Sequence, residues 1–511
     1  MAVRALPYVG VVMLVALIRG WMHFSTPLMK GVNGAYYLVQ ARALLERGSM
    51  AIPDFPLTFG LHAGLAKLIQ WGTGWDLDES ILFAVKVLDS LLPALAAIPI
   101  LALLEYWRRT TTQAPRWIPI AGAIVATLGL PTMRMLGDFQ KNGLAMVWLA
   151  AFLWFLHAWF QRPTGKLAAC ALASFGLIGI THLGVLGSAI LIGVLISVLQ
   201  LVQEKRGAWQ RSAMWLGAMG GVLACAVVII HQFDPERVSR LLGAISHPLS
   251  FAQGKGEPLP GMTIAEYAVF RTLTFTLLFG GMALPALIVV WRRRSTLPSS
   301  TCSVVAGCGL AVLAMIGPWG TSGDRLLRFM ILAYFPACLI LFFAIQFISR
   351  PKLQIACAVM AAGLWIGPMP GSLAVYGRAA IPDAAGSELR ALKSLIPKPG
   401  NTLIVTGHGL EWWAAWMLET KISQGTTMEI SDWENYEEVL FLTQKTDLLP
   451  MTELAVKGGG GTPESSTESA KTTIVGSYFA SPPIPKQAQV LHDGTYFTLA
   501  RVLSPPPYLT Q

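Results

Sequence analysis

The stretch NGAYYLVQARALLERGSMAIPDFPL, residues 33–57, follows directly on the first hydrophobic run of the chain. Within residues 34–47 the apolar and polar side chains recur with a helical period, which predicts an amphipathic helix lying in a membrane interface. Gly48 predicts the end of this helix, and Pro53 and Pro56 predict a turn after it. Residues 57–71 predict a second, mainly apolar helix, so the long loop over residues 24–80 is expected to be structured.

The composition indicates a membrane protein. Hydrophobic residues make up 54% of the chain and charged residues only 13%, with a mean hydropathy of +0.55, whereas about a quarter of the residues of a soluble protein are charged. The sequence predicts an α-helical polytopic bundle of about eleven spans, several of them near the ~20 residues that a bilayer requires. The apolar runs cover residues 5–23, 81–104, 117–130, 143–160, 167–181, 184–202, 212–231, 266–291, 302–317, 326–348 and 353–369.

Basic residues in the short loops set the expected orientation, because Lys and Arg near span ends are retained in the cytoplasm. Such residues follow the even-numbered spans and share one side with Arg4. We therefore expect a cytoplasmic N-terminus, an uncleaved first span and an extracytoplasmic C-terminus, in a prokaryotic inner (plasma) membrane. This distribution also accounts for most of the net charge of +10, which leaves nucleic-acid binding with little support.

Few charged or reactive side chains lie inside the predicted spans. Lys86 and Asp89 are three residues apart in the second span, and we expect them to pair, because either charge alone would be costly in hydrocarbon. All six cysteines fall inside predicted spans, so the sequence indicates neither a disulfide framework nor a cysteine metal site.

A second polar segment, PTMRMLGDFQKN at residues 131–142, joins the third and fourth spans. Its acid, Asp138, lies between Arg134 and Lys141. Such an acid at the mouth of a bundle can hold a metal ion or an attacking hydroxyl while the cations meet a phosphate. The alternative is an interfacial ion pair that caps the fourth span.

A third polar segment, PWGTSGDRLLR at residues 318–328, begins the tenth span. Arg325 and Arg328 are three residues apart and so share a helix face, which suits a phosphate or pyrophosphate group. The alternative is that both cations snorkel at a helix end. His182, in the tip between the fifth and sixth spans, is a further candidate for contact with a head group or a metal, or is simply solvated.

From about residue 371 to 511 the composition is that of a soluble domain, after a membrane domain over residues 1–370. The patterns predict a small extracytoplasmic α/β domain. Its expected elements are helices at 385–396 and 411–421, strands at 402–406, 438–443 and 495–503, and a flexible insert at 457–471. Where the first strand meets the second helix, Glu411 would begin a helix that sets Trp412 and Trp413 near the membrane surface, or the two indoles pack this domain on the bundle.

The arrangement resembles the membrane-integral glycosyltransferases of the GT-C class, which include oligosaccharyltransferase catalytic subunits, protein O-mannosyltransferases and the lipid A aminoarabinose transferase. The resemblance covers the layout of the spans. In that class the first extracytoplasmic loop has an acidic residue ahead of an aromatic pair, then an Ala-Arg helix, a glycine and a proline-rich turn. The corresponding positions here are Asn33, Tyr36-Tyr37, Ala41-Arg42, Gly48 and residues 53–57, and Asp138 would be the acid of the second catalytic loop.

This sequence departs from the class at Asn33, which stands where the class has an acid acting as catalytic base. An amide oxygen can ligate a metal or accept a hydrogen bond, but it cannot take a proton at useful pH. Either Asp54 or Asp138 takes the part of that acid, or the chain binds substrate without the usual chemistry. The tryptophan pair is similar to the acceptor-recognising motif of oligosaccharyltransferase subunits, although no Asp-Tyr-Gly follows it here.

The resemblance implies a membrane glycosyltransferase that moves a sugar from a polyprenyl-phosphate-linked donor to an extracytoplasmic lipid, protein or glycan acceptor. The alternatives are a non-catalytic relative that binds or presents a lipid-linked glycan and, third, a secondary transporter. A divalent ion, Mg²⁺ or Mn²⁺, is possible at Asp138. The expected catalytic residues are Asp138, Asp54 and Asn33, and the expected substrate-binding residues are Tyr36, Tyr37, Arg42, Lys141, His182, Arg325, Arg328, Glu411, Trp412 and Trp413.

Overall fold

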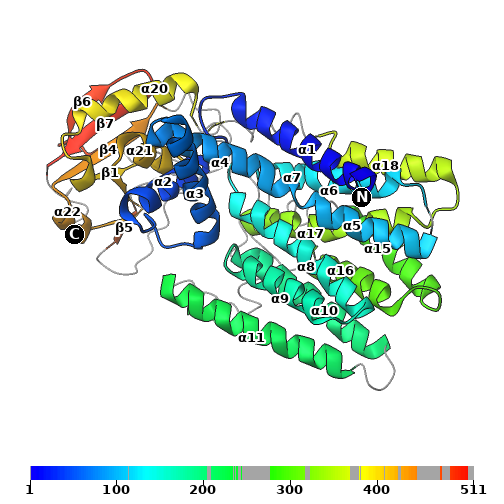
Figure 1. Cartoon of the computed structure of the whole chain (residues 1–511). Helices are drawn as coiled ribbons and strands as arrows, with labels where there is room; N and C mark the ends of the chain where they lie inside the picture. Colours follow the sequence, from blue (N-terminus) through cyan, green and yellow to red (C-terminus); the bar gives the residue numbers. More distant parts are fainter. Residues whose placement is uncertain are drawn as a thin grey trace.

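The structure is a computed structural model. It describes residues 2–112, 114–203, 209–233, 277–316, 323–368, 381–407, 409–423, 427–445, 472–474 and 484–503, with a few isolated positions between these ranges. A bundle of long helices lies beside a smaller domain built on a β-sheet, and the helices α2 and α3 lie at the end of the bundle nearest this sheet (Figure 1).

Each apolar run expected from the sequence overlaps a helix of the bundle. A helix satisfies its backbone hydrogen bonds internally, which is what an apolar segment in lipid requires. The helices are α1 (Ala2–Phe24), α4 (Leu77–Ala94), α5 (Ala97–Trp107), α6 (Trp117–Leu128), α8 (Gln140–Gln161), α9 (Gly165–Gly179), α10 (Leu183–Gln203), α11 (Trp209–Phe233), α15 (Leu277–Arg293), α16 (Ser299–Ile316), α17 (Gly323–Ile345) and α18 (Pro351–Trp365).

Seven helical stretches of the described chain are long and apolar enough to cross a membrane, by length and composition. The longest, Leu77–Thr112, combines α4 and α5, and α6 and α9 are shorter apolar helices. The chain is thus an α-helical polytopic membrane protein, and the expected number of eleven spans stays a prediction.

The two helices expected in the first loop are present. Helix α2 spans Gly34–Arg47 and ends at Gly48, whose φ of +69° is a left-handed conformation that favours glycine. Helix α3 spans Pro56–Thr73. The predicted polar face of α2 is partly wrong, because Gln40 and Arg42 are buried. Gln40 accepts a hydrogen bond from the amide of Ala51 at 2.8 Å and so fixes the chain that follows the helix.

The C-terminal domain contains a five-stranded sheet with the strand order β2-β1-β4-β7-β6. The central strand β4 is parallel to β1 on one side and antiparallel to β7 on the other. The strands are β1 (Thr402–Val405), β2 (Lys421–Ile422), β4 (Glu438–Gln444), β6 (Gln489–Asp493) and β7 (Phe497–Val502), and a separate pair is formed by β3 (Thr427–Glu429) and β5 (Thr472–Ile474).

The helices of this domain are α20 (Asp383–Ala391), α21 (Glu411–Leu418) and α22 (Ile430–Asn435). The helix expected at 411–421 ends early, because Glu419 adopts a left-handed conformation with a φ of +59° and the chain turns into β2. The three predicted strands are present, whereas β2 and β6 were not predicted. The insert at 457–471 lies outside the described residues, and the domain boundary near residue 370 stays a prediction.

The sheet domain and the first loop share one hydrophobic core. Tyr37 of α2 and Phe59 of α3 belong to the same buried cluster as Ile404 of β1, Trp413 of α21 and Leu440 of β4. Because these side chains come from both parts, α2 is held between the bundle and the sheet rather than lying free on a surface. The site described below lies at the first turn of this helix.

A carboxylate on α20 fastens the β6–β7 hairpin. Glu388 accepts hydrogen bonds from the amides of Phe497 at 3.0 Å, Tyr496 at 3.1 Å and Thr495 at 3.1 Å. Burial raises the pKa of Glu388, but the amides of Tyr496 and Phe497, together with His492, outweigh it and lower the pKa below its ordinary 4.5. The carboxylate therefore stabilises the hairpin above that pH and loses this effect as the pH falls through the lowered pKa.

We expect Glu388→Gln to weaken the hairpin by about 1–2 kcal/mol, because hydrogen bonds to a charged acceptor contribute about 1.5–3 kcal/mol and the amide oxygen keeps part of them. Hydrogen–deuterium exchange of residues 489–502 in the full chain should be faster in this variant. The difference from wild type should shrink as the pH falls below 4.5. Glu437→Gln, which alters an exposed carboxylate, is the control, and unchanged exchange in the Glu388 variant would contradict the prediction.

Candidate functional site

Asp138 is buried where the loop before α8 meets the first turn of α2. One carboxylate oxygen accepts a hydrogen bond from the backbone N–H of Asn33 at 2.7 Å, and the amide of Val32 donates to the same carboxylate. The other oxygen pairs with Arg134 at 3.2 Å. The side chain is only 3% exposed in this setting. The structure therefore brings Asn33 and Asp138 into direct contact.

Two glycines permit this close approach. Gly31 has a φ of +82° and Gly137 a φ of +79°. A Cβ atom at Gly31 would collide with the Asp138 carboxylate, and one at Gly137 would collide with the backbone carbonyl of Lys30. Only glycine suits both the left-handed backbone and the missing space. The segments at 30–33 and 137–138 are thus interlocked.

Asp54 is the second carboxylate of the site. Its side chain accepts hydrogen bonds from the Tyr36 hydroxyl and the Lys141 ammonium group, and one from the amide of Phe55 at 2.7 Å. Lys141 lies in the first turn of α8, three residues after Asp138, and its Nζ is 5.5 Å from the centre of the Tyr36 ring. The loop turn that carries Asp54 therefore reaches the same helix start as Asp138.

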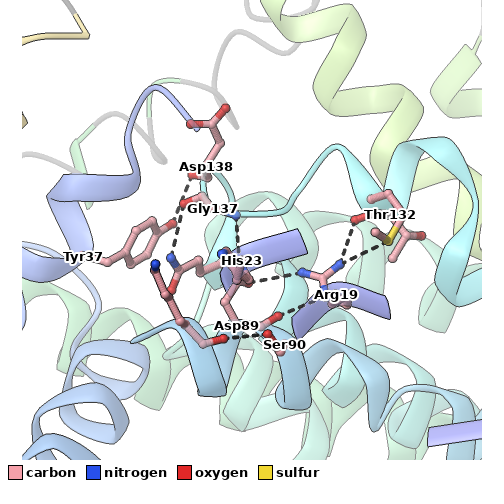
Figure 2. Close-up of polar contacts among 11 residues, drawn as sticks. Arg19, His23, Tyr37, Asp89, Ser90, Thr132, Gly137 and Asp138 are labelled. Carbon is pink, nitrogen blue, oxygen red and sulfur yellow. Dashed lines mark hydrogen bonds and ion pairs between the residues drawn. The ribbon is translucent and has the colours of Figure 1, made fainter. Parts of the chain in front are cut away.

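Tyr36 and Tyr37 of α2 contact both carboxylate residues of the site. Tyr37 donates its hydroxyl to the backbone carbonyl of Asp138 at 3.2 Å (Figure 2). Burial raises the pKa of both Tyr36 and Tyr37 well above the ordinary value, so both hydroxyls act as hydrogen-bond donors. Burial also raises the pKa of Asp138, although Arg134 opposes this. Asn33, Tyr36, Tyr37, Asp54, Asp138 and Lys141 thus form one connected cluster.

A buried ion pair that the sequence analysis missed lies behind this cluster. Asp89 of α4 accepts a hydrogen bond from His23 at 2.7 Å and pairs with Arg19 at 3.3 Å, and all three side chains are fully buried (Figure 2). The same carboxylate accepts the backbone N–H of Gly137 at 2.8 Å. Asp89 therefore links α1 and α4 to the residue just before Asp138.

The expected pair of Lys86 and Asp89 is wrong. Lys86 instead donates to the backbone carbonyl of Thr26 at 2.7 Å. Spacing within one helix suggested the pair, but the partners of Asp89 come from α1, far along the chain. Arg19 and His23 inside the first apolar run were the available signal, because ionisable side chains within a span need a buried partner.

The other expected substrate-binding residues lie in three different settings. Arg42 forms an ion pair with Asp78 at 2.6 Å and donates to the carbonyl of Trp416 at 2.8 Å, which ties α2 to α21 and α4. The ring nitrogen Nδ1 of His182 accepts the amide of Val185 at 3.3 Å in the first turn of α10. Arg328 is exposed on α17, and the side chain of Arg325 lies outside the described part of the chain.

The tryptophan pair is divided between two environments. Trp413 is 1% exposed and packs in the core of the sheet domain. Trp412 is half-buried, and its ring lies edge-on to Tyr36 with ring centroids 4.6 Å apart. Glu411 is buried and accepts a hydrogen bond from the amide of Gly409. Only Trp412 of these three contacts the Asp54 and Asp138 cluster through a described contact.

Similar solved structures include two of ArnT from Cupriavidus metallidurans. The one with bound undecaprenyl phosphate has 14% sequence identity and a TM-score of 0.52 over 98% of each chain. The apo structure has 14% identity and a TM-score of 0.54 over 98% of this chain and 100% of that one. The Archaeoglobus fulgidus oligosaccharyltransferase, in complex with Zn and sulfate, has 13% identity and a TM-score of 0.51 over 84% of this chain and 67% of its own.

This chain has the GT-C fold. The likeness extends over nearly the whole length of both ArnT chains and includes the C-terminal sheet domain. No family model and no curated protein matches the sequence. The resemblance to the GT-C class is therefore confirmed at the level of the fold.

The site offers a poor donor set for the possible divalent metal. Magnesium prefers several oxygen ligands around it, whereas Asp138 is paired with Arg134 and Asp54 with Lys141. Among the described residues no group of three or more His, Cys, Asp or Glu side chains is placed to hold a metal ion. The mechanism proposed below therefore uses no metal, and a metal at Asp138 stays a prediction.

We expect Asp89→Asn to destabilise the protein by about 3–5 kcal/mol, because removing one partner leaves the buried charge of Arg19 uncompensated. The measurement is the thermal unfolding midpoint of the detergent-solubilised chain. Asp78→Asn, which removes a half-exposed partner of Arg42, should cost about 1 kcal/mol or less. Combining Arg19→Met with Asp89→Leu should recover much of the loss, and an Asp89→Asn midpoint equal to wild type would contradict the role of this pair.

Proposed function

We propose that this chain is a glycosyltransferase that moves a sugar from a polyprenyl-phosphate-linked donor to an acceptor hydroxyl outside the cytoplasm. The observation that carries the proposal is the convergence of Asn33, Asp54 and Asp138, with Lys141, at one end of a GT-C fold. The similar ArnT structure with bound undecaprenyl phosphate supports a polyprenyl phosphate as the lipid. The basic residues of the short loops support the orientation.

In the proposed reaction the acceptor hydroxyl attacks the anomeric carbon in line with the departing phosphate. A carbon–oxygen bond forms to the acceptor, the bond from the anomeric carbon to the phosphate oxygen breaks, and its electron pair leaves on the phosphate. The hydroxyl proton goes to a carboxylate of the site. Cations near the phosphate stabilise the charge that develops there.

Asp138 suits the role of proton acceptor better than Asp54. Burial raises the pKa of Asp138, which brings this carboxylate closer to the range where a base is effective. Asp54 is engaged by the ammonium group of Lys141 and the hydroxyl of Tyr36. We assign Asp54 to holding Lys141 in place, and Lys141 with Arg325 and Arg328 to the phosphate.

The second candidate function is a non-catalytic protein that binds a lipid-linked glycan. Two observations favour it: Asn33 replaces the acid expected in this fold class, and both remaining carboxylates have cationic partners. A binder and a transferase would both retain affinity for the lipid. A measurement of sugar transfer is therefore needed to distinguish the two functions.

We expect Asp138→Asn to abolish sugar transfer while the protein stays folded, because the amide has nearly the same volume and cannot accept the proton. Transfer is measured with a panel of polyprenyl-phosphate-linked sugars.

A second variant, Asn33→Asp, should raise activity or leave it unchanged, since position 33 adjoins Asp138. Lys67→Ala, on the exposed face of α3, is the control. Full activity of the Asp138 variant would remove this residue from the mechanism, and lipid binding without transfer in every variant would favour the second candidate function.

The pH dependence of transfer provides a separate prediction. Activity should fall on the acid side around a pKa above the ordinary 3.8 of an aspartate, because the buried base is protonated there. Arg134 lowers the pKa of Asp138, so Arg134→Gln should move this acid limb upward, by about one pH unit or more for the loss of an adjacent charge. The measurement is the pH profile of kcat/KM. An acid limb that does not move would assign the titration to another group.

A further inference from the structure

A hollow lies on the far side of α2 from the Asp138 contact. It is a cleft of about 620 Å³ between α2 and the sheet domain, a volume typical of small-molecule sites. One wall is a single face of α2, and the other is formed by α21, β2 and the turn before β1. The lining residues that carry charge or an aromatic ring are Arg42, Glu46, Arg47, Trp412, Glu419, Lys421 and Tyr436.

Two cations of this cleft lack an acidic partner among the described residues. Arg42 pairs with Asp78 and Glu419 with Lys393, so both have partners outside the lining. Arg47 and Lys421 form no such ion pair in the described chain, and Glu46 pairs with neither of them. Burial and the charge of Arg47 both lower the pKa of Lys421. The two cations therefore lie close enough to repel each other, and an anion between them would relieve this repulsion.

The aromatic side chains of the cleft indicate what the ligand carries besides an anionic group. Trp412 and Tyr436 are half-buried at the cleft, and the flat face of an aromatic ring suits the apolar C–H face of a sugar ring. The Trp412 ring also contacts Tyr36, whose hydroxyl donates to Asp54. One aromatic layer thus separates the cleft from the carboxylate cluster.

We propose that this cleft binds an anionic saccharide, a sugar that carries a phosphate or a carboxylate. Arg47 and Lys421 hold the anionic group, and Trp412 and Tyr436 flank the ring. The binding itself does not depend on transfer. The cleft lies on the far side of Trp412 from Asp54 and has none of the cluster residues in its lining, so this site is separate from that of the proposed transfer.

The test is isothermal titration calorimetry on the full chain in detergent, with glucose 6-phosphate and glucuronate as probes and with glucose and inorganic phosphate as comparisons. Both anionic sugars should bind wild type, and more tightly than glucose or phosphate alone. The double variant Arg47→Gln with Lys421→Gln should weaken both by about tenfold or more, as expected for the loss of two charge contacts. Arg47→Lys alone should retain most of the affinity. Lys67→Ala, outside the cleft, should match wild type.

Three results would overturn the proposal. These are no binding of either anionic sugar to wild type, equal affinity in the double variant with its circular dichroism unchanged, and inorganic phosphate binding as tightly as glucose 6-phosphate. The last would reveal a simple anion site. Binding of the sugars by a chain that transfers none would leave this inference standing and refute the proposed function.

Discussion

The buried contact of Asp89 with Arg19 and His23 is the constraint on which the site depends. Taking charged groups out of water costs several kcal/mol for each ion, and an oppositely charged partner offsets this only with good geometry and further hydrogen bonds. Asp89 meets that requirement by accepting the amide of Gly137 as well. The ion pair therefore fixes α1, α4 and the loop before α8 together, and the position of Asp138 follows from that loop.

The first loop is fixed from the opposite side by the sheet domain. Helix α2 shares a core with β1, β4 and α21, and Arg42 adds an ion pair and a stacking contact 3.7 Å above the ring of Trp416. With α2 held in this way, the amide of Asn33 and the hydroxyl of Tyr37 reach Asp138 in a defined geometry.

The elements that the sequence predicted well are those with local signals. The bounds 34–47 for the loop helix followed from its periodicity and from Gly48, and the overlap of the apolar runs with helices followed from composition. The contact between Asn33 and Asp138 required only that both segments lie at the same end of the bundle. The failures concern partners that do not follow from local spacing. Asp89 binds Arg19 and His23 rather than Lys86, and Arg42 contacts Trp416 of a domain that follows hundreds of residues later. The short strand β2 depends on its neighbour β1.

The amide at position 33 also changes the charge balance of the site. With all side chains in their ionised forms, Asp138 and Asp54 are matched by Arg134 and Lys141, so the cluster is neutral. An acid at position 33 would add a negative charge beside Asp138, and only a further cation would offset it. In this neutral cluster Lys141 would be shared between Asp54 and a departing phosphate. A transferase built on this site therefore needs cations from outside the matched set, and the arginines that begin α17 are the ones that the sequence places at a neighbouring span end.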